Sequence, residues 1–401
     1  MTSLLSIFLV SFALIVAVPA TVLFVEIIAA IFLSQPNYSI SSSECEIGRV
    51  AVVVPAHNES TGLLSTLLDL RVQLNKHDRL LVVADNCSDD TAAVARSAGA
   101  EVIERNEPDR KGKGFALAYA ISHLKADPPR FVIFADADCR IERGVIHTLA
   151  SVCAQTNRPV QSFSSMVAPS NSPLNTRVAE FAWRVKNYLR PRGLAAMGLP
   201  CQLMGCGMAF PWEVICNANL ASTSIVEDLK LGIDLAFAGH LATFCSDAGM
   251  VSEFPTTPEG LQTQRARWEK GHINIILAAW PRLMLSAIVN RNLQLSALAL
   301  DLAIPPLSLL SMLAVAAVAI TSLAHYLGAP SASMFIAWEG LLALVSSVVS
   351  AWLRYGRSIL PASSLVSILP YIAKKFGLYR SIMFGISSSD WIRTDRTKDP
   401  E

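Results

Sequence analysis

The sequence predicts an α/β fold, a mixed and mostly parallel sheet flanked by helices, with transmembrane helices on its N-terminal and C-terminal sides. Two observations carry this prediction. Short β-branched runs alternate with helical segments in the middle of the chain, which is typical of parallel sheets. Of the 401 residues, 52% are hydrophobic, which is too many for an ordinary water-soluble protein, and the excess lies in long apolar runs near both ends.

The first apolar run, Leu4–Leu33, is nearly unbroken, and its only strong interruptions are Pro19 and Glu26. A helix of this length rises about 45 Å, more than the roughly 30 Å thickness of the bilayer hydrocarbon requires. A cleaved signal peptide would have a basic segment before a shorter apolar run, and no basic residue precedes this one. We therefore expect residues 1–44 to form a retained transmembrane anchor and a linker.

Two further apolar stretches, Leu295–Leu323 and Met334–Leu353, lie near the C-terminus. Asp301 and Pro305-Pro306 interrupt the first stretch. Because proline breaks a helix, we expect a discontinuous helix whose membrane-spanning part begins near Leu307.

Basic residues predict the orientation of these spans. The loop between the two C-terminal stretches has no Lys or Arg, whereas the second stretch is followed by Arg354, Arg357, Lys374, Lys375 and Arg380. By the positive-inside rule, the region before Leu295 and the C-terminal tail face the cytoplasm. We expect three crossings in all, one by the N-terminal anchor and about two within a C-terminal membrane region at residues 281–401. This region also contains an interfacial segment at Ser358–Ile372 and a cytoplasmic tail. The protein is then an integral membrane protein, of the inner membrane if the source is bacterial.

Charge and cysteine usage exclude two classes of site. A net charge of +1 offers no general electrostatic attraction for nucleic acid. The eight cysteines include no Cys-x-x-Cys pair, so they do not predict a zinc site. In the reducing cytosol we expect buried free thiols.

Residues 45–280 are expected to form a cytoplasmic domain between the membrane segments. Its first half predicts strands at Arg49–Val54, Leu80–Ala84, Val102-Ile103 and Phe131–Ala135, and helices at Gly62–Leu74, Thr91–Ala98 and Gly114–Leu124. Ligands of such sheets bind beyond the carboxyl ends of the strands. Three polar segments fall at these ends, namely Pro55-Ala56-His57-Asn58-Glu59, Asp85-Asn86 and Asp136-Ala137-Asp138.

The second half of this domain is less regular. Arg190-Pro191-Arg192-Gly193 and Gly205-Cys206-Gly207 predict loops. Ile225–Ala238 predicts a helix with Glu227 and Asp228 in its first turn.

Asp136 and Asp138 are two residues apart in a segment predicted to be extended, so both side chains project from one face. Two carboxylates suit Mg²⁺ or Mn²⁺, which take further ligands from water and substrate phosphates. The alternative interpretation is a solvated turn.

Asp85 has the chemistry to accept a hydrogen bond from a ring N–H of a base, although Asn86 and the residues after it also favour a simple Asx-turn. Lys111-Gly112-Lys113-Gly114 precedes a predicted helix, where backbone N–H groups and a lysine favour phosphate. It lacks the P-loop spacing, and an ordinary solvated loop is the alternative.

Asp228 is the candidate general base, because a carboxylate is largely ionised at neutral pH. Glu227 and Asp228 also suit the first turn of a helix by charge alone. Arg265 and Arg267 offer charge to a leaving diphosphate, and Trp268 offers a flat face to a sugar. Membrane-interface anchoring is the alternative for these three.

Taken in order, these segments resemble the family 2 inverting glycosyltransferases over about residues 49–272, in the membrane-bound branch of cellulose synthase, hyaluronan synthase and ceramide glucosyltransferase-like enzymes. The six motifs are Val54-Pro55-Ala56-His57-Asn58-Glu59, Val83–Thr91, Lys111-Gly112-Lys113-Gly114, Asp136-Ala137-Asp138, Glu227-Asp228 and Gln264-Arg265-Ala266-Arg267-Trp268.

The resemblance implies a GT-A fold and a nucleotide-sugar donor, usually UDP-linked, with Mg²⁺ or Mn²⁺ as cofactor. It assigns donor binding to Glu59, Asp85, Lys113, Asp136, Arg265 and Arg267, metal binding to Asp136 and Asp138, catalysis to Asp228 with Glu227, and the acceptor side to Gln264 and Trp268. Ala84-Asp85-Asn86 departs from the common Asp-Asp-Gly, which leaves one acid to recognise the base.

We therefore expect transfer of one sugar to a lipid-linked or saccharide acceptor near the membrane, in surface polysaccharide or glycolipid synthesis. Gly205-Cys206-Gly207 departs from the family pattern beside the acceptor and leaves its identity open. Processive polymer synthesis is one alternative, although about three spans are few for a polymer channel. A catalytically silent membrane scaffold and, more remotely, a nucleotidyltransferase are the others.

Overall fold

A computed structural model describes residues 3–38 and 47–367, which fall into two compact units. The apolar unit contains residues 3–34, 170–197 and 262–367, and the sheet unit contains residues 35–38, 47–169 and 198–261. The division into an anchor, a catalytic domain and a C-terminal membrane region stays a prediction.

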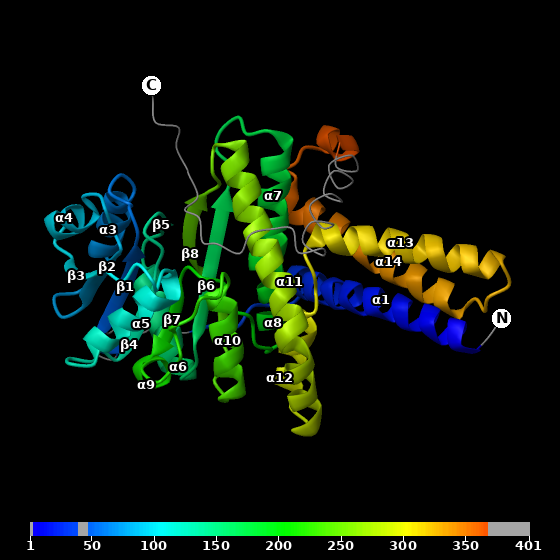
Figure 1. The fold of residues 1–401 in the computed structure, drawn as a ribbon, viewed down its shortest axis with the longest axis horizontal. Helices are drawn as coiled ribbons and strands as arrows, with labels where there is room; N and C mark the ends of the chain where they lie inside the picture. The colour runs from blue at the N-terminus through cyan, green and yellow to red at the C-terminus, as the bar shows by residue number, and fades with distance from the viewer. Residues whose placement is uncertain (1–2, 39–46, 368–401) are drawn as a thin grey trace. The chain divides into compact units, whose positions relative to one another are not determined.

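The sheet unit is built on a mixed eight-stranded sheet in the order β3-β2-β1-β4-β7-β6-β8-β5 (Figure 1). The strands are β1 (Val50–Ala56), β2 (Arg79–Asp85), β3 (Glu101–Arg105), β4 (Phe131–Phe134), β5 (Arg140–Ile141), β6 (Val160–Val167), β7 (Met208–Pro211) and β8 (Thr243–Glu253). Four pairs are parallel, β1–β2, β1–β4, β2–β3 and β6–β8, and three are antiparallel, β4–β7, β5–β8 and β6–β7. The predicted mostly parallel sheet is confirmed.

Helices cover both faces of the β1–β4 region. In this unit they are α3 (Leu63–Arg71), α4 (Thr91–Ser97), α5 (Lys113–Leu124), α6 (Val145–Thr156), α9 (Trp212–Ile215) and α10 (Glu227–Phe237). Val52 and Val54 share one core with the buried leucines of α3 and the apolar side of α6. The intervening Ala51 and Val53 are equally buried and point to the opposite face, where α5 packs on β1, β2 and β3. Burial on both faces explains why these strands are continuous apolar runs rather than alternating ones.

The helices and strands predicted for this half of the domain are present, with boundaries shifted by a few residues at most. The predicted helix over Ile225–Ala238 is α10, and Glu227 and Asp228 lie in its first turn. Gly205 and Gly207 have φ values of +95° and +72°, in the left-handed region that glycine favours, so the predicted loop is confirmed.

The apolar unit is helical. Its elements are α1 (Ser3–Phe32), α7 (Leu174–Arg184), the π-helix η1 (Val185–Leu189), α8 (Arg190–Ala196), α11 (Pro258–Val289, mostly in this unit), α12 (Leu293–Leu302), α13 (Leu307–Tyr326), α14 (Ala332–Ala351), the π-helix η2 (Trp352–Gly356) and the 3₁₀-helix η3 (Ala362–Ser367). Helix α14 packs on α1 and on α13, as Figure 1 shows for the blue, yellow and orange helices.

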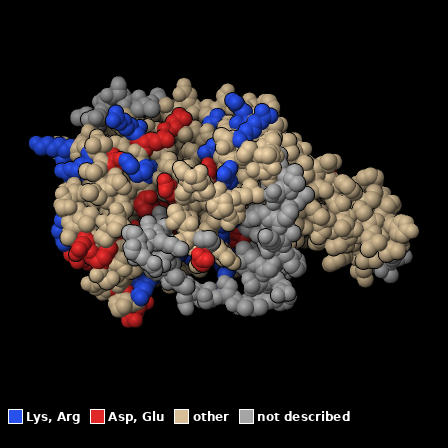
Figure 2. Space-filling view, turned by 90° about the horizontal axis from the view of Figure 1, so that it is seen from above, with Lys and Arg blue, Asp and Glu red and all other residues tan. Residues whose placement is uncertain are grey.

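Four helices of the described chain are long and apolar enough to cross a membrane, at Leu4–Phe32, Glu259–Val289, Leu307–Tyr326 and Ala332–Gly356. The sequence argument counted three and omitted Glu259–Val289, whose N-terminal part is charged. The predicted break is confirmed, because α12 ends at Leu302 and α13 begins at Leu307. Figure 2 shows an almost uncharged surface over the end of the apolar unit where α1, α13 and α14 lie in Figure 1. The last part of the predicted interfacial segment, residues 368–372, lies outside the described residues.

The prediction of a loop at Arg190-Pro191-Arg192-Gly193 is wrong, because these residues begin helix α8. Helix α8 continues directly from the π-helix η1, and Pro191 lies just after this junction. The regular i to i−4 hydrogen bonds are already interrupted at a π-helical turn, so the missing N–H of proline is tolerated there. Gly193 is required by packing rather than by a turn. A β-carbon on Gly193 would lie 1.9 Å from the backbone oxygen of Glu26, so only glycine lets α8 approach α1 this closely.

Arg190 forms a buried ionic cluster with Glu26 of α1 and Asp301 of α12, and each of the three residues is at most 5% exposed. Its Nη2 lies 2.6 Å from Asp301 Oδ1, and its Nε lies 3.3 Å from Glu26 Oε2. Nη2 also donates to the backbone oxygen of Asp301 at 2.6 Å. The cluster therefore joins three helices that are far apart in the sequence.

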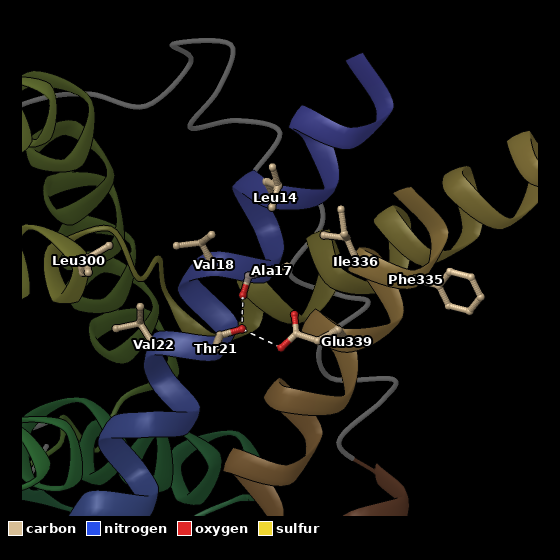
Figure 3. A pocket seen from close by; sticks show the side chains of 9 residues that line it. All are labelled: Leu14, Ala17, Val18, Thr21, Val22, Leu300, Phe335, Ile336 and Glu339. Atoms are coloured by element: carbon tan, nitrogen blue, oxygen red, sulfur yellow. Dashed lines mark hydrogen bonds between the residues drawn. The ribbon is translucent and has the colours of Figure 1, made fainter. Parts of the chain in front are cut away.

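Helices α1, α12 and α14 line a groove of about 500 Å³, drawn in Figure 3. Its walls are aliphatic or aromatic except for Thr21 and Glu339. The Thr21 hydroxyl donates to Glu339 Oε1, 2.9 Å away, and lies at the same distance from the backbone oxygen of Ala17. Glu339 is exposed, so this polar pair lies at the surface of the helix bundle, where a hydrogen bond between α1 and α14 satisfies it.

Candidate active site

The carboxyl ends of β1, β2 and β4 lie next to one another at one edge of the sheet. In the parallel register Ala56 pairs with Ala84, and Val53 pairs with Phe134, the last residue of β4. The polar segments that follow these strands therefore converge, as the sequence predicts.

At the β2 end, Asp85 is 6% exposed and pairs with the buried Arg105 at the end of β3. Arg105 Nη1 lies 2.5 Å from Asp85 Oδ1, and Asn86 Nδ2 donates to the same oxygen at 3.0 Å. Asn86 has a φ of +50°, which turns the chain away from β2. The carboxylate is therefore held in one orientation by a cation and an amide.

The segment after β1 is tied to the segment after β2 by hydrogen bonds. His57 Nδ1 lies 2.7 Å from the backbone oxygen of Asp85, and Asn58 Oδ1 accepts from the backbone N–H of Ser88 at 2.8 Å. The backbone N–H of Glu59 donates to Thr91 Oγ1 at 2.8 Å. Glu59 is thus placed at the same sheet edge as Asp85, as predicted, and its donor contact stays a prediction.

Lys113 opens α5 and forms an ion pair with Asp136 beyond β4. Gly112 before it has a φ of +131°, a conformation open to glycine, which lets the chain turn into the helix. The carboxylates of Asp136 and Glu227 raise the pKa of Lys113 above its ordinary value against the effect of burial, so this lysine stays cationic.

Buried neighbours hold the Asp136-Ala137-Asp138 loop in place. Thr66 Oγ1 of α3 lies 2.9 Å from the backbone oxygen of Ala137 and 2.7 Å from that of Cys139. Cys206 Sγ accepts from the backbone N–H of Asp136 at 3.4 Å. Ala137 is buried, whereas both aspartates are partly exposed. The loop therefore presents the two carboxylates outward from a fixed backbone.

Asp228 reaches the same region from α10. A β-carbon on Gly205 would lie 3.1 Å from Asp228 Oδ2 and 3.9 Å from Lys113 Nζ, so these three residues meet. Asp228 Oδ1 accepts from the backbone N–H of Leu229 at 2.8 Å. The structure therefore brings Asp228 and Glu227 to the Lys113–Asp136 pair, which the sequence alone did not establish.

Burial and the neighbouring Asp228 carboxylate raise the pKa of Glu227 from an ordinary 4.5 to about 7, although Lys113 opposes the shift. Glu227 thus titrates near neutrality. Because a proton on Glu227 removes one of the negative charges beside Asp228, it lowers the electrostatic repulsion in the pair.

This raised pKa predicts a pH-dependent stability. Between pH 4.5 and about pH 7, Glu227 is protonated in the folded chain but ionised in the unfolded chain. The free energy of unfolding therefore falls as the pH rises through this range, and the loss is complete above about pH 7. Glu227→Gln removes this titration. The difference in unfolding temperature, variant minus wild type, should therefore become more positive as the pH is raised from about 5 to about 8. Thermal unfolding of the detergent-solubilised protein measures it.

The exposed Glu213 serves as the control, since Glu213→Gln should leave the same profile unchanged. Parallel profiles for wild type and Glu227→Gln across this range would contradict the prediction.

The donor set at Asp136 and Asp138 fits a divalent cation that takes most of its ligands from elsewhere. Among the residues that the structure describes, no group of three or more His, Cys, Asp or Glu side chains is arranged to hold a metal. Two partly exposed carboxylates without a third protein ligand suit Mg²⁺ or Mn²⁺, which retain waters and bind substrate phosphates.

The four remaining predicted residues, Gln264, Arg265, Arg267 and Trp268, lie on α11 within the apolar unit. Trp268 packs on Trp183 of α7, with ring centroids 4.9 Å apart, and Arg265 Nη2 lies 3.9 Å from Glu269 Oε1 one turn away. Their place beside a diphosphate and an acceptor stays a prediction.

Sequence reasoning missed Arg105, whose only signal is a basic residue at the end of a short strand. It also missed the contact between Cys139 and Cys206, whose sulfur atoms lie 3.6 Å apart beneath Asp136. The expectation of free thiols is confirmed for the cysteines that the structure describes, and five of these seven are buried.

Comparisons with known proteins bear on the family and the fold. A family model described as "Glycosyltransferase like family 2" matches residues 48–271, more than half of the chain. The low-salt glycan biosynthesis hexosyltransferase Agl6 of Haloferax volcanii is 35% identical over 92 residues, which are 22% of this chain and 21% of that protein. The chain thus matches about one fifth of the length of this relative.

Among solved structures, the mannosyltransferase PcManGT of Pyrobaculum calidifontis, in complex with GDP-Man and Mn²⁺, is similar with a TM-score of 0.50 and 17% identity, over 86% of this chain and 98% of that one. Glucosyl-3-phosphoglycerate synthase of Mycobacterium tuberculosis, in complex with Mn²⁺ and UDP-Glc, has a TM-score of 0.41 and 22% identity, over 64% of this chain and 84% of that one. The first similarity supports the GT-A fold. Because this family model matches more than half of the chain, including all eight strands of the sheet, the chain belongs to the glycosyltransferase-like family 2.

Proposed function

We propose that the protein is a membrane-anchored inverting glycosyltransferase. It moves one sugar from a nucleotide-sugar, UDP-linked by our assignment, to a lipid-linked or membrane-proximal acceptor in surface polysaccharide or glycolipid synthesis. The observation that carries the proposal is the meeting of the Lys113–Asp136 ion pair with the Glu227-Asp228 pair at the carboxyl ends of the strands. It supplies a cation for a diphosphate and a carboxylate for a hydroxyl in one place.

The residues divide the reaction between them. Lys113 stays charged, so it binds the diphosphate and offsets the negative charge that grows on it as the sugar leaves. Asp228 removes the proton of the acceptor hydroxyl as that oxygen attacks the anomeric carbon from the opposite face, which inverts its configuration. Asp85 accepts from the base of the nucleotide, and Glu59 contributes to the nucleoside end.

Asp136 and Asp138 are the residues that would hold Mg²⁺ or Mn²⁺. When bound, the metal supplies a Lewis acid that stabilises negative charge on phosphate oxygens. The structure of the mannosyltransferase PcManGT is a complex with GDP-Man and Mn²⁺, which supports the assignment.

We assign Arg265 and Arg267 to the diphosphate and Gln264 with Trp268 to the acceptor, on the resemblance of their motif alone. The four apolar helices support an integral membrane location, with the sheet unit in the cytoplasm, and so a membrane-bound branch of the family. A membrane-held enzyme meets lipid-linked acceptors at high local concentration, which is why we favour them.

The proposal predicts that the purified protein releases UDP from one member of a panel of UDP-sugars when an acceptor is present, and does so only with Mn²⁺ or Mg²⁺. In Asp138→Ala the metal-dependent rate should fall by about 100-fold or more, the size expected when stabilisation of a developing charge is lost. The Mn²⁺-dependent rise in unfolding temperature with UDP should also be lost.

Asp127→Ala is the matched control, because Asp127 is an exposed aspartate at the opposite end of β4, paired with Arg49. It should leave both measurements unchanged. UDP release that Asp138→Ala does not alter would remove the metal assignment, and a protein that binds no nucleotide-sugar would favour a silent scaffold. Long polymer made by this chain alone would replace single transfer with processive synthesis.

A further inference from the structure

We infer that Arg105 and Asn86 determine which nucleotide the donor carries, by occupying one oxygen of Asp85 and leaving the other to a base with a single ring N–H donor. The inference rests on the proposed function and deepens it. It assigns the donor to uracil or thymine nucleotides rather than to guanine nucleotides.

The two oxygens of Asp85 have different surroundings. Oδ1 accepts from Arg105 Nη1 at 2.5 Å and from Asn86 Nδ2 at 3.0 Å. Since a carboxylate oxygen has two lone pairs, these two donors fill it. Within the described part of the chain no residue donates to Oδ2. Asp85 therefore offers a ligand only one acceptor oxygen, Oδ2.

Arg105 is not free to withdraw from this contact. Its Nη2 donates to the backbone oxygen of Arg110 at 2.7 Å and to Glu107 Oε2 at 3.0 Å. Its guanidinium lies 5.5 Å from the centroid of the Phe115 ring, and Arg105 is 5% exposed. The same side chain thus connects the base-recognising Asp85 to the segment that leads into Lys113.

Asn86 is fixed as well. Its backbone N–H donates to the backbone oxygen of Arg105 at 2.7 Å, and its Oδ1 accepts from the backbone N–H of Glu107 at 2.8 Å. The amide therefore has its nitrogen left for Asp85 Oδ1. Arg105 and Asn86, the two donors to Oδ1, are both held by residues at or just after the end of β3. We expect them to stay in place when a nucleotide binds.

The bases differ in how many donors they present to a carboxylate. Uracil and thymine present one ring N–H between two carbonyl groups, which one oxygen satisfies. Guanine presents a ring N–H and an amino group side by side, a fork that matches two free carboxylate oxygens. With Oδ1 filled, one guanine donor would be left poorly satisfied when buried, and this costs affinity.

The test compares dissociation constants of UDP and GDP for the full-length protein with Mn²⁺, by titration calorimetry. Wild type should bind UDP about tenfold or more tightly than GDP, the ratio that one poorly satisfied hydrogen bond produces. Arg105→Met opens Oδ1, so UDP binding should weaken and the preference for UDP should fall by about threefold or more. Asn86→Ala opens one position on Oδ1 and should shift the preference in the same direction, without removing a buried charge.

Arg79→Met is the matched control, because Arg79 also bridges β2 and β3, through Glu101, but at the other end of the strands. If the β2–β3 contacts served only to hold the structure, all three variants would bind both nucleotides more weakly to the same extent. The ratio of the GDP and UDP dissociation constants would then stay unchanged, so this ratio reports specificity separately from stability. Unfolding temperatures show whether Arg105→Met is folded, and if it is not, Asn86→Ala decides.

The inference is overturned if wild type binds GDP as tightly as UDP, if the ratio is the same in Asn86→Ala and Arg105→Met as in wild type, or if Arg79→Met shifts it equally. In each of these cases nucleotide binding itself persists, so the proposed function stands. A wild-type protein that binds neither nucleotide removes the proposed function and this inference together.

Discussion

Asp228→Asn should lower the rate of sugar transfer by about 10²–10⁴-fold, the contribution of a general base, while UDP binding stays within about threefold of wild type. The amide has the shape of the carboxylate, and its oxygen is able to keep the hydrogen bond from the backbone N–H of Leu229, so the start of α10 should be undisturbed. It cannot take up the acceptor proton. Single-turnover transfer with the sugar identified in the UDP-sugar panel measures the rate, and calorimetry measures the binding.

Asp234→Asn is the control on the same helix. Asp234 lies two turns further along α10 and pairs with Lys230 at 2.5 Å, outside the site. Its replacement should leave the rate unchanged, since an exposed ion pair one turn apart contributes only about 0.3–0.5 kcal/mol to helix stability. A transfer rate in Asp228→Asn within a few-fold of wild type would show that another group is the base.

Arg190→Met should destabilise the protein strongly, because it leaves the carboxylates of Glu26 and Asp301 buried without their cation. Removing one partner of a buried ionic cluster costs about 3–5 kcal/mol, more than most single substitutions. Glu26 is already under-satisfied, since its Oε1 is buried and has no hydrogen-bond partner among the described residues. We expect a lower unfolding temperature and less monodisperse protein after solubilisation, measured by size-exclusion chromatography and thermal unfolding.

Two further variants separate charge from packing. Arg192→Met, on the same helix, removes hydrogen bonds to the neutral Ala30 backbone oxygen and the Tyr188 hydroxyl, and should cost only about 1 kcal/mol. Adding Glu26→Gln and Asp301→Asn to Arg190→Met removes the uncompensated charge, so most of the lost stability should return. Equal losses in Arg190→Met and Arg192→Met, or no recovery in the triple variant, would show that the cluster is held by packing alone.

Much of the sheet unit was predictable from the sequence because its signals are local. Val50–Ala56 and Phe131–Phe134 are continuous apolar runs, and such runs between helical segments indicate strands buried on both faces. Asp85 ends β2 and Asp136 lies just beyond β4, so both acids must lie at the same end of the sheet when these strands run parallel to β1. The break between α12 and α13 followed from Pro305-Pro306 for an equally local reason.

The partners of these residues were not predictable, because they come from elsewhere in the chain. Asp85 meets Arg105 only because β2 and β3 pair in a register that places the two residues opposite each other. Lys113 meets Asp136 through the packing of α5 on the sheet. The mistaken loop at Arg190–Gly193 has the same origin, since proline and glycine usually interrupt a helix, and here the approach of α8 to α1 requires the glycine.

By itself, the sequence determined the mostly parallel sheet, the apolar helices before and after it, and the acids at the strand ends, because hydrophobic periodicity and turn chemistry act over a few residues. Only the tertiary structure decided that one oxygen of Asp85 is occupied, that Asp228 meets the Lys113–Asp136 pair, and that Arg190 joins Glu26 and Asp301. These contacts depend on strand register and helix packing across long stretches of chain. Hydrogen bonds and ion pairs act over a few ångströms, so their partners are known only once the fold has brought them together.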